Sequence, residues 1–250
     1  MPTVAELTQA YGNVLLAPQP GPGVCETCFN LTDGYDRCYA CAHGGRWLDV
    51  VVPISYSVGG EQLHHALVAY KRTLEPVATH FTVQLAAVLW RFLAGHEQCV
   101  SRTLGVPGFA VVTTVPSNDP ARDDPPLNRL VGQLVEPTRE RFRRLLVRSA
   151  HPMRPHQFDV DRYEPTGQLT DEPVLLIDDT WTTGANAQSA AAALKRAGAG
   201  PVAAVVIGRH LNRAWGSNDS QLNGLPKPFD WEHCVRCKQP DVPGMNKSSQ

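Results

Sequence analysis

Four short runs of apolar, mostly β-branched residues alternate with segments of helical periodicity, and this alternation constrains the fold more than any other feature. The runs cover residues 50–58, 109–115, 174–177 and 202–207. Short uncharged runs are typical of strands that are buried on both faces, and helices between successive strands are typical of parallel βα units. The sequence therefore predicts an α/β fold with a mostly parallel sheet flanked by helices.

The segments between the runs show apolar stripes at helical spacing. Helices are predicted over residues 63–70, 77–95, 127–134, 138–148 and 188–196. Pro76 is expected to open the second of these helices and Gly95 to end it. The proline-containing segment 149–172 is predicted to be a long loop or flap.

Six of the seven cysteines occur in pairs separated by two residues. The first two pairs, Cys25 with Cys28 and Cys38 with Cys41, form two knuckles whose four thiolates can surround Zn²⁺ as a tetrahedron. A segment of this length buries too little apolar surface to fold alone, so metal binding would supply its folding free energy. An iron–sulfur cluster is the alternative for four thiolates.

The third cysteine pair lies near the carboxyl terminus, where His233, Cys234 and Cys237 form a half-site. One hypothesis is a second zinc site completed by His43 or His233. Another is that the tail pair joins one of the two amino-terminal knuckles, and a third is an inert tail. The seventh cysteine, Cys99, is expected to be a small buried core residue.

Composition excludes several classes of protein. The 250 residues are 42% hydrophobic and carry a formal net charge of -1, which argues against disorder and against a protein that coats nucleic acid or anionic lipid. The apolar runs are far shorter than the roughly 20 residues of a membrane span. The amino terminus lacks the basic and apolar regions of a signal peptide. With paired cysteines that suit metal binding, we expect a cytoplasmic protein without a membrane partner.

The sharpest motif follows the third apolar run, where Asp178 and Asp179 precede a loop and an Ala-rich helix. The loop and helix start comprise Thr180, Trp181, Thr182, Thr183, Gly184, Ala185 and Asn186. Backbone N–H groups of such a loop and of the helix start can bind a phosphate, and hydroxyl groups add donors. Two carboxylates would repel that phosphate but suit sugar hydroxyls or a magnesium-bound sugar.

The loop therefore predicts a ribose 5-phosphate site, with both acids on the ribose hydroxyls. It is not a GxxxxGK[ST] loop, because no lysine follows the glycine. The structural alternative is a strand–turn–helix in which Asp and Thr act only as caps.

The motif resembles the ribose-phosphate signature of type I phosphoribosyltransferases. From Cys25 to about Arg209, the wider pattern resembles the ComF-type competence-protein family, which is amidophosphoribosyltransferase-like. The resemblance rests on the four-cysteine ribbon, Tyr56, Gly59, Lys71, Val115-Pro116 and the phosphate loop. It implies a type I phosphoribosyltransferase sheet behind an amino-terminal zinc ribbon, and binding of phosphoribosyl pyrophosphate with Mg²⁺. It also suggests a link to DNA-uptake machinery.

The chain departs from that family in three places. Residues 117–128 are acidic where the family has a basic stretch and Gly-Phe-Asn, and Asn186 stands where Thr or Ser is common. Purine-salvage members have an Asp at the position of Thr182, so salvage of purine bases is not predicted. Lys71 and Arg72 are candidate pyrophosphate contacts, with a solvated helix end as the alternative.

The sequence leads to a domain division and to two hypotheses on function. The division is an extension over 1–24, a zinc ribbon over 25–48, a phosphoribosyltransferase-like domain over 49–212 and a polar tail over 213–250. The first hypothesis is a phosphoribosyltransferase that displaces pyrophosphate from C1 of the ribose, with Asp178 and Asp179 as its catalytic residues. The second is a non-catalytic binder of phosphoribosyl pyrophosphate or a nucleotide, such as a DNA-uptake factor. A homodimer is a further expectation.

Overall fold

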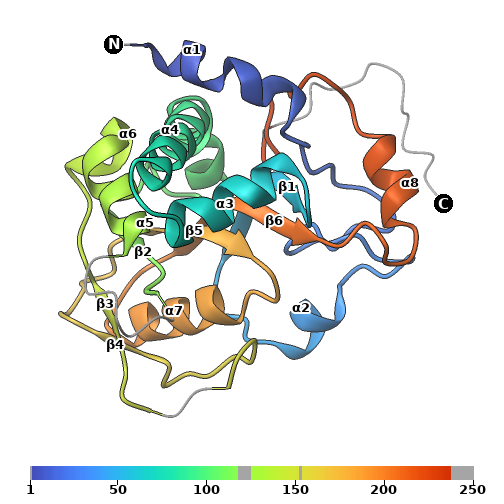
Figure 1. Cartoon of the computed structure of the whole chain (residues 1–250). Coiled ribbons are helices and arrows are strands. Elements are labelled where there is room, and N and C mark those ends of the chain that lie inside the picture. The colour runs from blue at the N-terminus through green and yellow to red at the C-terminus, as the bar shows by residue number, and fades with distance from the viewer. Residues whose placement is uncertain (1, 118–124, 152–153, 238–250) are drawn as a thin grey trace.

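Four parallel strands form the sheet that the sequence predicts (Figure 1). They belong to a computed structural model that describes residues 2–117, 125–151 and 154–237. The strands are β1 (Val50–Val58), β2 (Val111–Thr114), β5 (Val174–Trp181) and β6 (Val202–Leu211). Their order is β1-β6-β5-β2 and every pairing is parallel. The predicted α/β class and parallel sheet are therefore confirmed.

Strand β5 is hydrogen-bonded to β6 on one side and to β2 on the other. Side chains alternate along it, so Leu175 and Ile177 lie in one buried cluster and Val174 and Leu176 in another. Because both faces of β5 are covered, its residues have no need of a polar face, and this explains the uninterrupted apolar run.

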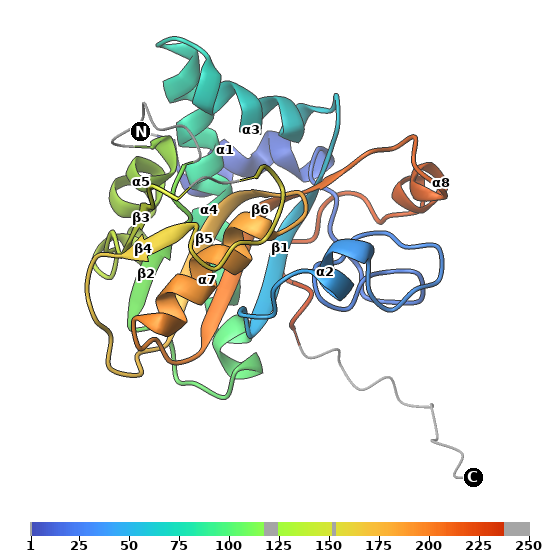
Figure 2. The same cartoon turned by 90° about the horizontal axis from the view of Figure 1, so that it is seen from below.

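Helices cover both faces of the sheet, as Figure 2 shows. On the face of Leu175 lie α3 (Gln62–Arg72) and α4 (Val77–Thr103), and on the face of Leu176 lies α7 (Ala185–Arg196). The smaller helical elements are α1 (Val4–Gln9), η1 (Ala10–Asn13), α5 (Pro126–Arg129), η2 (Leu130–Leu134) and α6 (Glu136–Arg139). The amino-terminal segment is more than an extension, because Tyr11 and Leu15 are buried in the α4 core.

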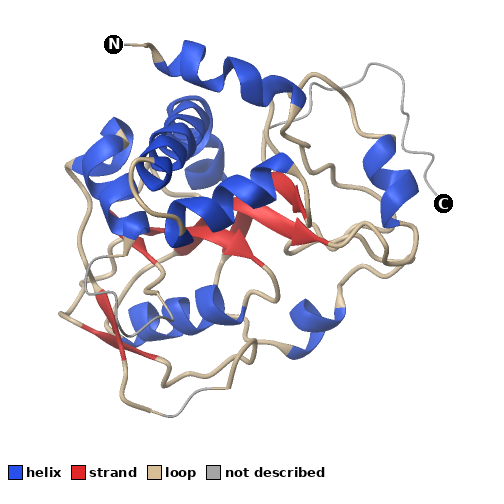
Figure 3. Ribbon diagram, viewed as in Figure 1, coloured by secondary structure: helices blue, strands red, loops and turns tan. Residues whose placement is uncertain are grey.

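The cysteine ribbon and residues 213–237 of the tail lie together beside β1, one of the two edge strands of the sheet (Figure 3). Each contributes one short helix, α2 (Tyr39–His43) in the ribbon and α8 (Asn218–Asn223) in the tail. The α8 helix was not expected from the polar sequence after residue 215. A buried cluster containing Leu31, Tyr56 and Leu222 joins ribbon, β1 and tail.

Helix α4 runs beyond Gly95, and the prediction that this glycine ends it is wrong. A glycine inside a helix costs only about 1 kcal/mol, and buried residues on the far side, His96 and Val100, offset that cost. A Cβ at position 95 would lie 4.0 Å from the carbonyl oxygen of Trp231, so the glycine borders the tail.

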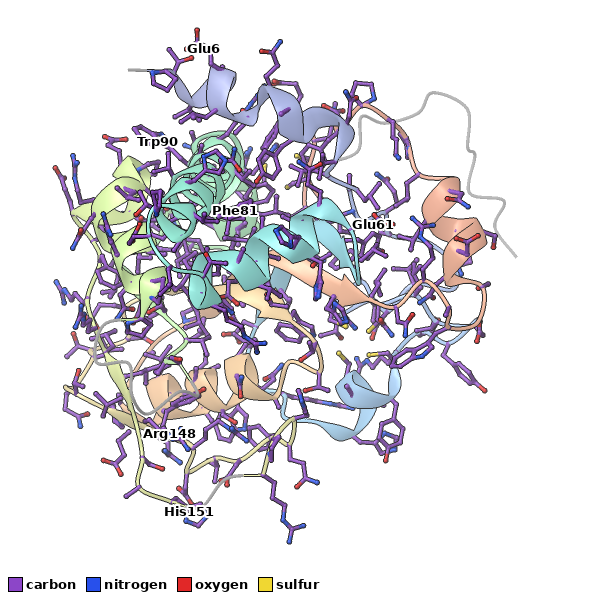
Figure 4. All side chains as sticks on the ribbon, viewed as in Figure 1. Glu6, Glu61, Phe81, Trp90, Arg148 and His151 are labelled. Carbon is purple, nitrogen blue, oxygen red and sulfur yellow. The ribbon has the colours of Figure 1, made fainter. Side chains whose placement is uncertain are left out.

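A basic helix over 138–148 is also not observed. The chain instead leaves α6, bridges β2 through Phe142 and Val112, and forms β3 (Leu146–Arg148). Arg143 N–H donates to the Val112 carbonyl at 2.9 Å, so pairing with the free edge of β2 overrides the helical spacing. Strand β3 pairs with β4 (Tyr163–Pro165), a strand inside the predicted flap. Figure 4 labels Arg148, at the end of β3, and His151, in the segment that follows it.

Within the described residues, α4 is the one helix that passes the length and composition test for a membrane span. Its best window has a mean hydropathy of 1.3, and 44% of that window is buried. The helix contacts α1, α3, β1 and β6, and Leu85, Leu89 and Phe92 lie in the core. These contacts make α4 the core helix of the sheet layer, and core helices pass the same test.

Leu176 tests the central position of β5. It is fully buried, so Leu176→Ala is expected to lower the free energy of unfolding by about 2–5 kcal/mol through lost burial and a residual cavity. The matched control is Leu74→Ala, because Leu74 is 86% exposed between α3 and α4. Urea denaturation measures both. Equal losses in the two variants would contradict the two-faced burial of β5.

Candidate functional site

The phosphate loop lies where β5 ends and α7 begins, at the carboxyl edge of the sheet. A small hollow of about 20 Å³ opens there. Its lining is His156, Asp178, Thr180, Thr182, Thr183, Gly184, Ala185, Asn186 and Ala187. Carboxyl edges of parallel sheets are where open α/β folds bind ligands. The structure therefore brings most of the predicted loop residues around one hollow.

Gly184 is required by the conformation of the loop. Its φ is +81°, a left-handed value that side chains rarely adopt, and it precedes the first residue of α7. A Cβ at this position would also lie 2.1 Å from Cζ2 of Trp181. The Trp181 ring is buried directly beneath the loop, so the loop closes over a large side chain and only glycine fits against it.

The hydroxyl group of Thr183 connects the loop to the flap and to the start of α7. Thr183 Oγ1 accepts a hydrogen bond from Ala185 N–H at 3.3 Å and donates one to the His156 carbonyl at 3.2 Å. Thr182 is exposed. Since α7 has 12 residues, the partial positive charge at its start adds to these donors. The arrangement suits an anion.

The two acids project to opposite faces of β5. Asp179 lies on the α3 side, where it accepts a hydrogen bond from Tyr70 Oη and its Oδ2 lies 2.5 Å from Lys71 Nζ. Asp178 is the acid in the lining of the hollow, whose lining does not include Asp179. The sequence placed both acids on the ribose, whereas in this structure Asp179 is buried and holds Lys71 at the sheet edge.

Asp178 is expected to titrate near neutral pH. Removal of water around the carboxyl group, and then the neighbouring Asp179 carboxylate, raise its pKa to about 7, while Lys71 opposes the shift. A raised pKa means that the native state takes up a proton more readily than the unfolded chain. The stability contributed by Asp178 is therefore present below about pH 4 and is lost as pH rises through 7.

The remaining candidates divide into two groups. Lys71 pairs with Asp179 and lies outside the lining of the hollow, whereas the side chain of Arg72 is exposed at the end of α3 and makes no hydrogen bond or ion pair in the described part of the chain. Of the atypical stretch 117–128, residues 118–124 lie outside the described residues. Tyr70 and His156 were missed as site residues, because Tyr70 reads as part of an apolar stripe and His156 as part of a loop.

A buried arginine fastens the predicted flap over the loop. Arg162 is 2% exposed and donates to the carbonyls of Arg154 at 2.8 Å and Gln157 at 2.7 Å. Asp159 N–H donates to Ser189 Oγ on α7 at 3.1 Å. These hydrogen bonds place His156 against the loop. No periodicity in the sequence predicts them.

A larger groove of about 850 Å³ adjoins the hollow on the ribbon side. It shares His156, Thr183, Gly184 and Ala185 with the hollow. Its other wall includes α2 and the strongly exposed ring of Tyr39. The groove links the ribbon to the loop.

The four ribbon cysteines converge as the sequence predicts. Their Sγ atoms all lie within 4.8 Å of one another, and those of Cys28 and Cys38 are 3.7 Å apart. None is in a disulfide. Hydrogen bonds among the thiols lower the pKa of Cys25 and raise the pKa values of Cys28 and Cys41. Four thiolates this close to one another repel, and a bound cation would offset that repulsion. The cluster is compatible with a structural zinc site without an open ligand position.

The predictions for the tail and for Cys99 need correction. His43 contacts the Tyr39 carbonyl and His233 contacts Asp230, so neither joins a cysteine cluster. The tail pair, Cys234 and Cys237, meets Cys99 and His96 of α4, not an amino-terminal knuckle. Cys99 is only half-buried and is no core residue.

Asp178→Asn tests the electrostatics of the loop without any ligand. The amide carries no charge to bury, so the variant is expected to unfold at a higher temperature than the wild type at pH 8. The difference should shrink as pH falls through 7 toward 4, where the wild-type carboxyl is protonated. Thermal melts at several pH values measure this. Asp36→Asn, at an exposed position, is the control, and a pH-independent difference in Asp178→Asn would contradict the assignment.

Cys28→Ser tests the ribbon site. Loss of one thiolate breaks the tetrahedron, so the purified protein is expected to lose about one zinc equivalent and its ribbon to become sensitive to proteases. Elemental analysis and limited proteolysis measure this, with Thr27→Ser as the neighbouring control. Retention of the wild-type zinc content by Cys28→Ser would speak against metal binding at the ribbon.

The sequence was compared with models of protein families and with curated proteins, and neither comparison gave a match. The resemblance stated above therefore rests on the sequence motifs alone.

Proposed function

We propose that the chain is a ComF-like protein of the phosphoribosyltransferase type, which binds phosphoribosyl pyrophosphate with Mg²⁺ and transfers the phosphoribosyl group to an acceptor. The observation that carries the proposal is the loop between β5 and α7. Its left-handed Gly184, its two threonines and the start of a 12-residue helix surround one hollow at the carboxyl end of a central strand. Helix starts with exposed N–H groups favour phosphate.

The 5-phosphate would lie in the hollow, against the N–H groups of residues 182–186. Thr182 offers a hydroxyl donor and the Asn186 amide offers another, whereas the hydroxyl of Thr183 donates to the His156 carbonyl. The Asp178 carboxylate in the lining would accept hydrogen bonds from ribose hydroxyls beyond the phosphate. It would do so in its charged form, and hydrogen bonds donated by the hydroxyls favour that form.

Asp179 contributes through Lys71. The buried carboxylate fixes the ammonium at the sheet edge, 2.5 Å from Oδ2, where its positive charge lies on the side of the sheet away from α7. A cation in this position would stabilise the negative charge that develops on departing pyrophosphate. Asp179 is then a positioning residue for Lys71.

The reaction would be a displacement at C1 of the ribose. An electron pair of the acceptor forms the new bond to C1, and the C1–O bond to pyrophosphate breaks. Pyrophosphate leaves with the electron pair of the broken C1–O bond, and the acceptor releases its proton. Bound Mg²⁺ supplies neutralising charge to the pyrophosphate. The loop, Asp178 and Lys71 hold the ribose ring and the leaving group in line.

The groove of about 850 Å³ is the space that an acceptor would use, because it shares three loop residues with the hollow. Its walls carry Tyr39, Phe158 and Arg46, which suit a planar or anionic group. None of the seven cysteines is in a disulfide, which agrees with the proposed location in a reducing cytoplasm.

Thr182→Val tests the phosphate assignment. The substitution keeps the shape and removes a hydroxyl that is exposed in the hollow, so the fold should be unchanged. Affinity for phosphoribosyl pyrophosphate with Mg²⁺ is expected to fall about 10-fold or more, since hydrogen bonds to charged groups contribute about 1.5–3 kcal/mol. Calorimetry measures this. The control is Thr170→Val, at an exposed position outside the site.

A double variant and a turnover assay complete the test. Asp178→Asn with Asp179→Asn should abolish binding, and unchanged affinity in that protein would refute the pocket. Pyrophosphate release is then followed with panels of amines and bases. Release that depends on one acceptor supports transfer. Tight binding without release for any acceptor would instead select the non-catalytic alternative.

A further inference from the structure

Helix α4 and the tail bring a second set of metal-binding side chains together, away from the phosphate loop. His96 and Cys99 lie one turn apart on α4, and Cys234 and Cys237 belong to the tail. The four potential ligand atoms all lie within 4.8 Å of one another. No part of the proposed function uses these residues.

The separations match a tetrahedral metal centre. Zn–S bonds of about 2.3 Å and Zn–N bonds of about 2.0–2.1 Å imply S···S edges of about 3.8 Å and S···N edges of about 3.5 Å. Cys237 Sγ lies 3.7 Å from Cys99 Sγ, 3.6 Å from Cys234 Sγ and 3.5 Å from His96 Nδ1. A disulfide would need about 2.05 Å, so these sulfurs are arranged around a shared point instead.

The histidine is already oriented as a ligand. His96 is 3% exposed, and its Nε2 lies 2.9 Å from the Trp231 carbonyl oxygen. A carbonyl only accepts, so Nε2 carries the proton and donates, and Nδ1 keeps its lone pair toward the sulfurs. Metal-binding histidines typically hold their second nitrogen in this way.

The surroundings of the sulfurs suit thiolates. Backbone N–H groups donate to them within the tail knuckle, from Cys234 to Cys237 Sγ at 3.1 Å and from Arg236 to Cys234 Sγ at 3.4 Å. Arg102 Nη2 lies 3.8 Å from Cys99 Sγ. Three thiolates, one neutral imidazole and Zn²⁺ leave one negative charge, and Arg102 and Arg236 offset it.

We propose that His96, Cys99, Cys234 and Cys237 bind a second zinc ion. Four protein ligands fill a tetrahedron, so the site is structural. It fastens the tail to α4, whose Arg91 guanidinium also lies 4.4 Å from the Trp231 ring. Beside it, Phe229 N–H of the tail donates to the Gly12 carbonyl of η1 at 2.6 Å.

The proposed second zinc site also positions Arg236. Its Nη2 donates to the Val51 carbonyl of β1 at 3.4 Å, and its guanidinium lies 5.3 Å from the Phe29 ring in the ribbon. Arg236 also lines the groove of about 850 Å³. The second metal site therefore links α4, β1 and the ribbon through the short knuckle of Cys234 and Cys237.

The test is the zinc content of the full chain, purified without chelator and measured by elemental analysis. Cys99→Ser and Cys234→Ser are each expected to lose about one zinc equivalent relative to wild type, while Cys28→Ser loses the ribbon equivalent independently. His233→Ala is the matched control, because His233 sits beside the knuckle but bonds to Asp230, and it should keep the wild-type content. Unchanged zinc in both cysteine variants, or loss in His233→Ala, would overturn the assignment.

A measurement on the unaltered chain covers variants that fail to fold. Cys99, Cys234 and Cys237 are only half-buried, so they should react with an alkylating reagent unless a metal holds them. Mass spectrometry is expected to find all three unlabelled in the native protein and labelled together after a chelator is added. Labelling of the three before the chelator would reject the site, whatever the ribbon does.

Discussion

The position of β5 between β6 and β2 is the constraint on which the rest of the site depends. Hydrogen bonds on both edges and apolar contacts on both faces fix the direction of the strand. Its end therefore presents a loop at a defined place, above the start of α7 and beside α3. Alternation along the same strand sends Asp178 toward the hollow and Asp179 toward Lys71, so the strand separates two adjacent acids into two roles.

The buried carboxyl group of Asp178 is an unfavourable feature that the surrounding packing holds in place. Burial raises its pKa to about 7. Gly184, in contrast, takes its left-handed conformation over the buried Trp181 ring without strain, because glycine has no Cβ. Buried carboxyl groups such as that of Asp178 are common at binding sites because a ligand can relieve the cost of their burial. Ribose hydroxyls that donate hydrogen bonds to Asp178 would favour its charged form, which agrees with the proposed ligand.

A feature could be predicted from the sequence where the interacting residues are close together in the chain, and not where they are far apart. Strand β1 was predicted at its observed limits, since a run buried on both faces is visible as a run. The segment after Pro137 was predicted to be helical and instead pairs through Phe142 with β2, because the edge of a distant strand decides its conformation. Arg162 and Tyr70 were missed for the same reason, as their partners lie in other segments of the chain.

The two cysteine clusters show this difference most clearly. In the ribbon, all four cysteines lie within 17 residues, so their spacing alone predicts the site. In the second cluster, two of the four side chains come from consecutive turns of α4, and the sequence separation between His96 and Cys237 is 141 residues. A lone cysteine and a lone histidine on a helix are most often core residues, and only the fold brings them to the tail.

If both clusters hold zinc, the edge strand β1 is bordered by two metal centres. The ligands of one are brought together by local sequence, and those of the other by tertiary packing. Two such cross-links would hold the ribbon and the tail against the sheet and so help to keep the groove beside the phosphate loop in shape.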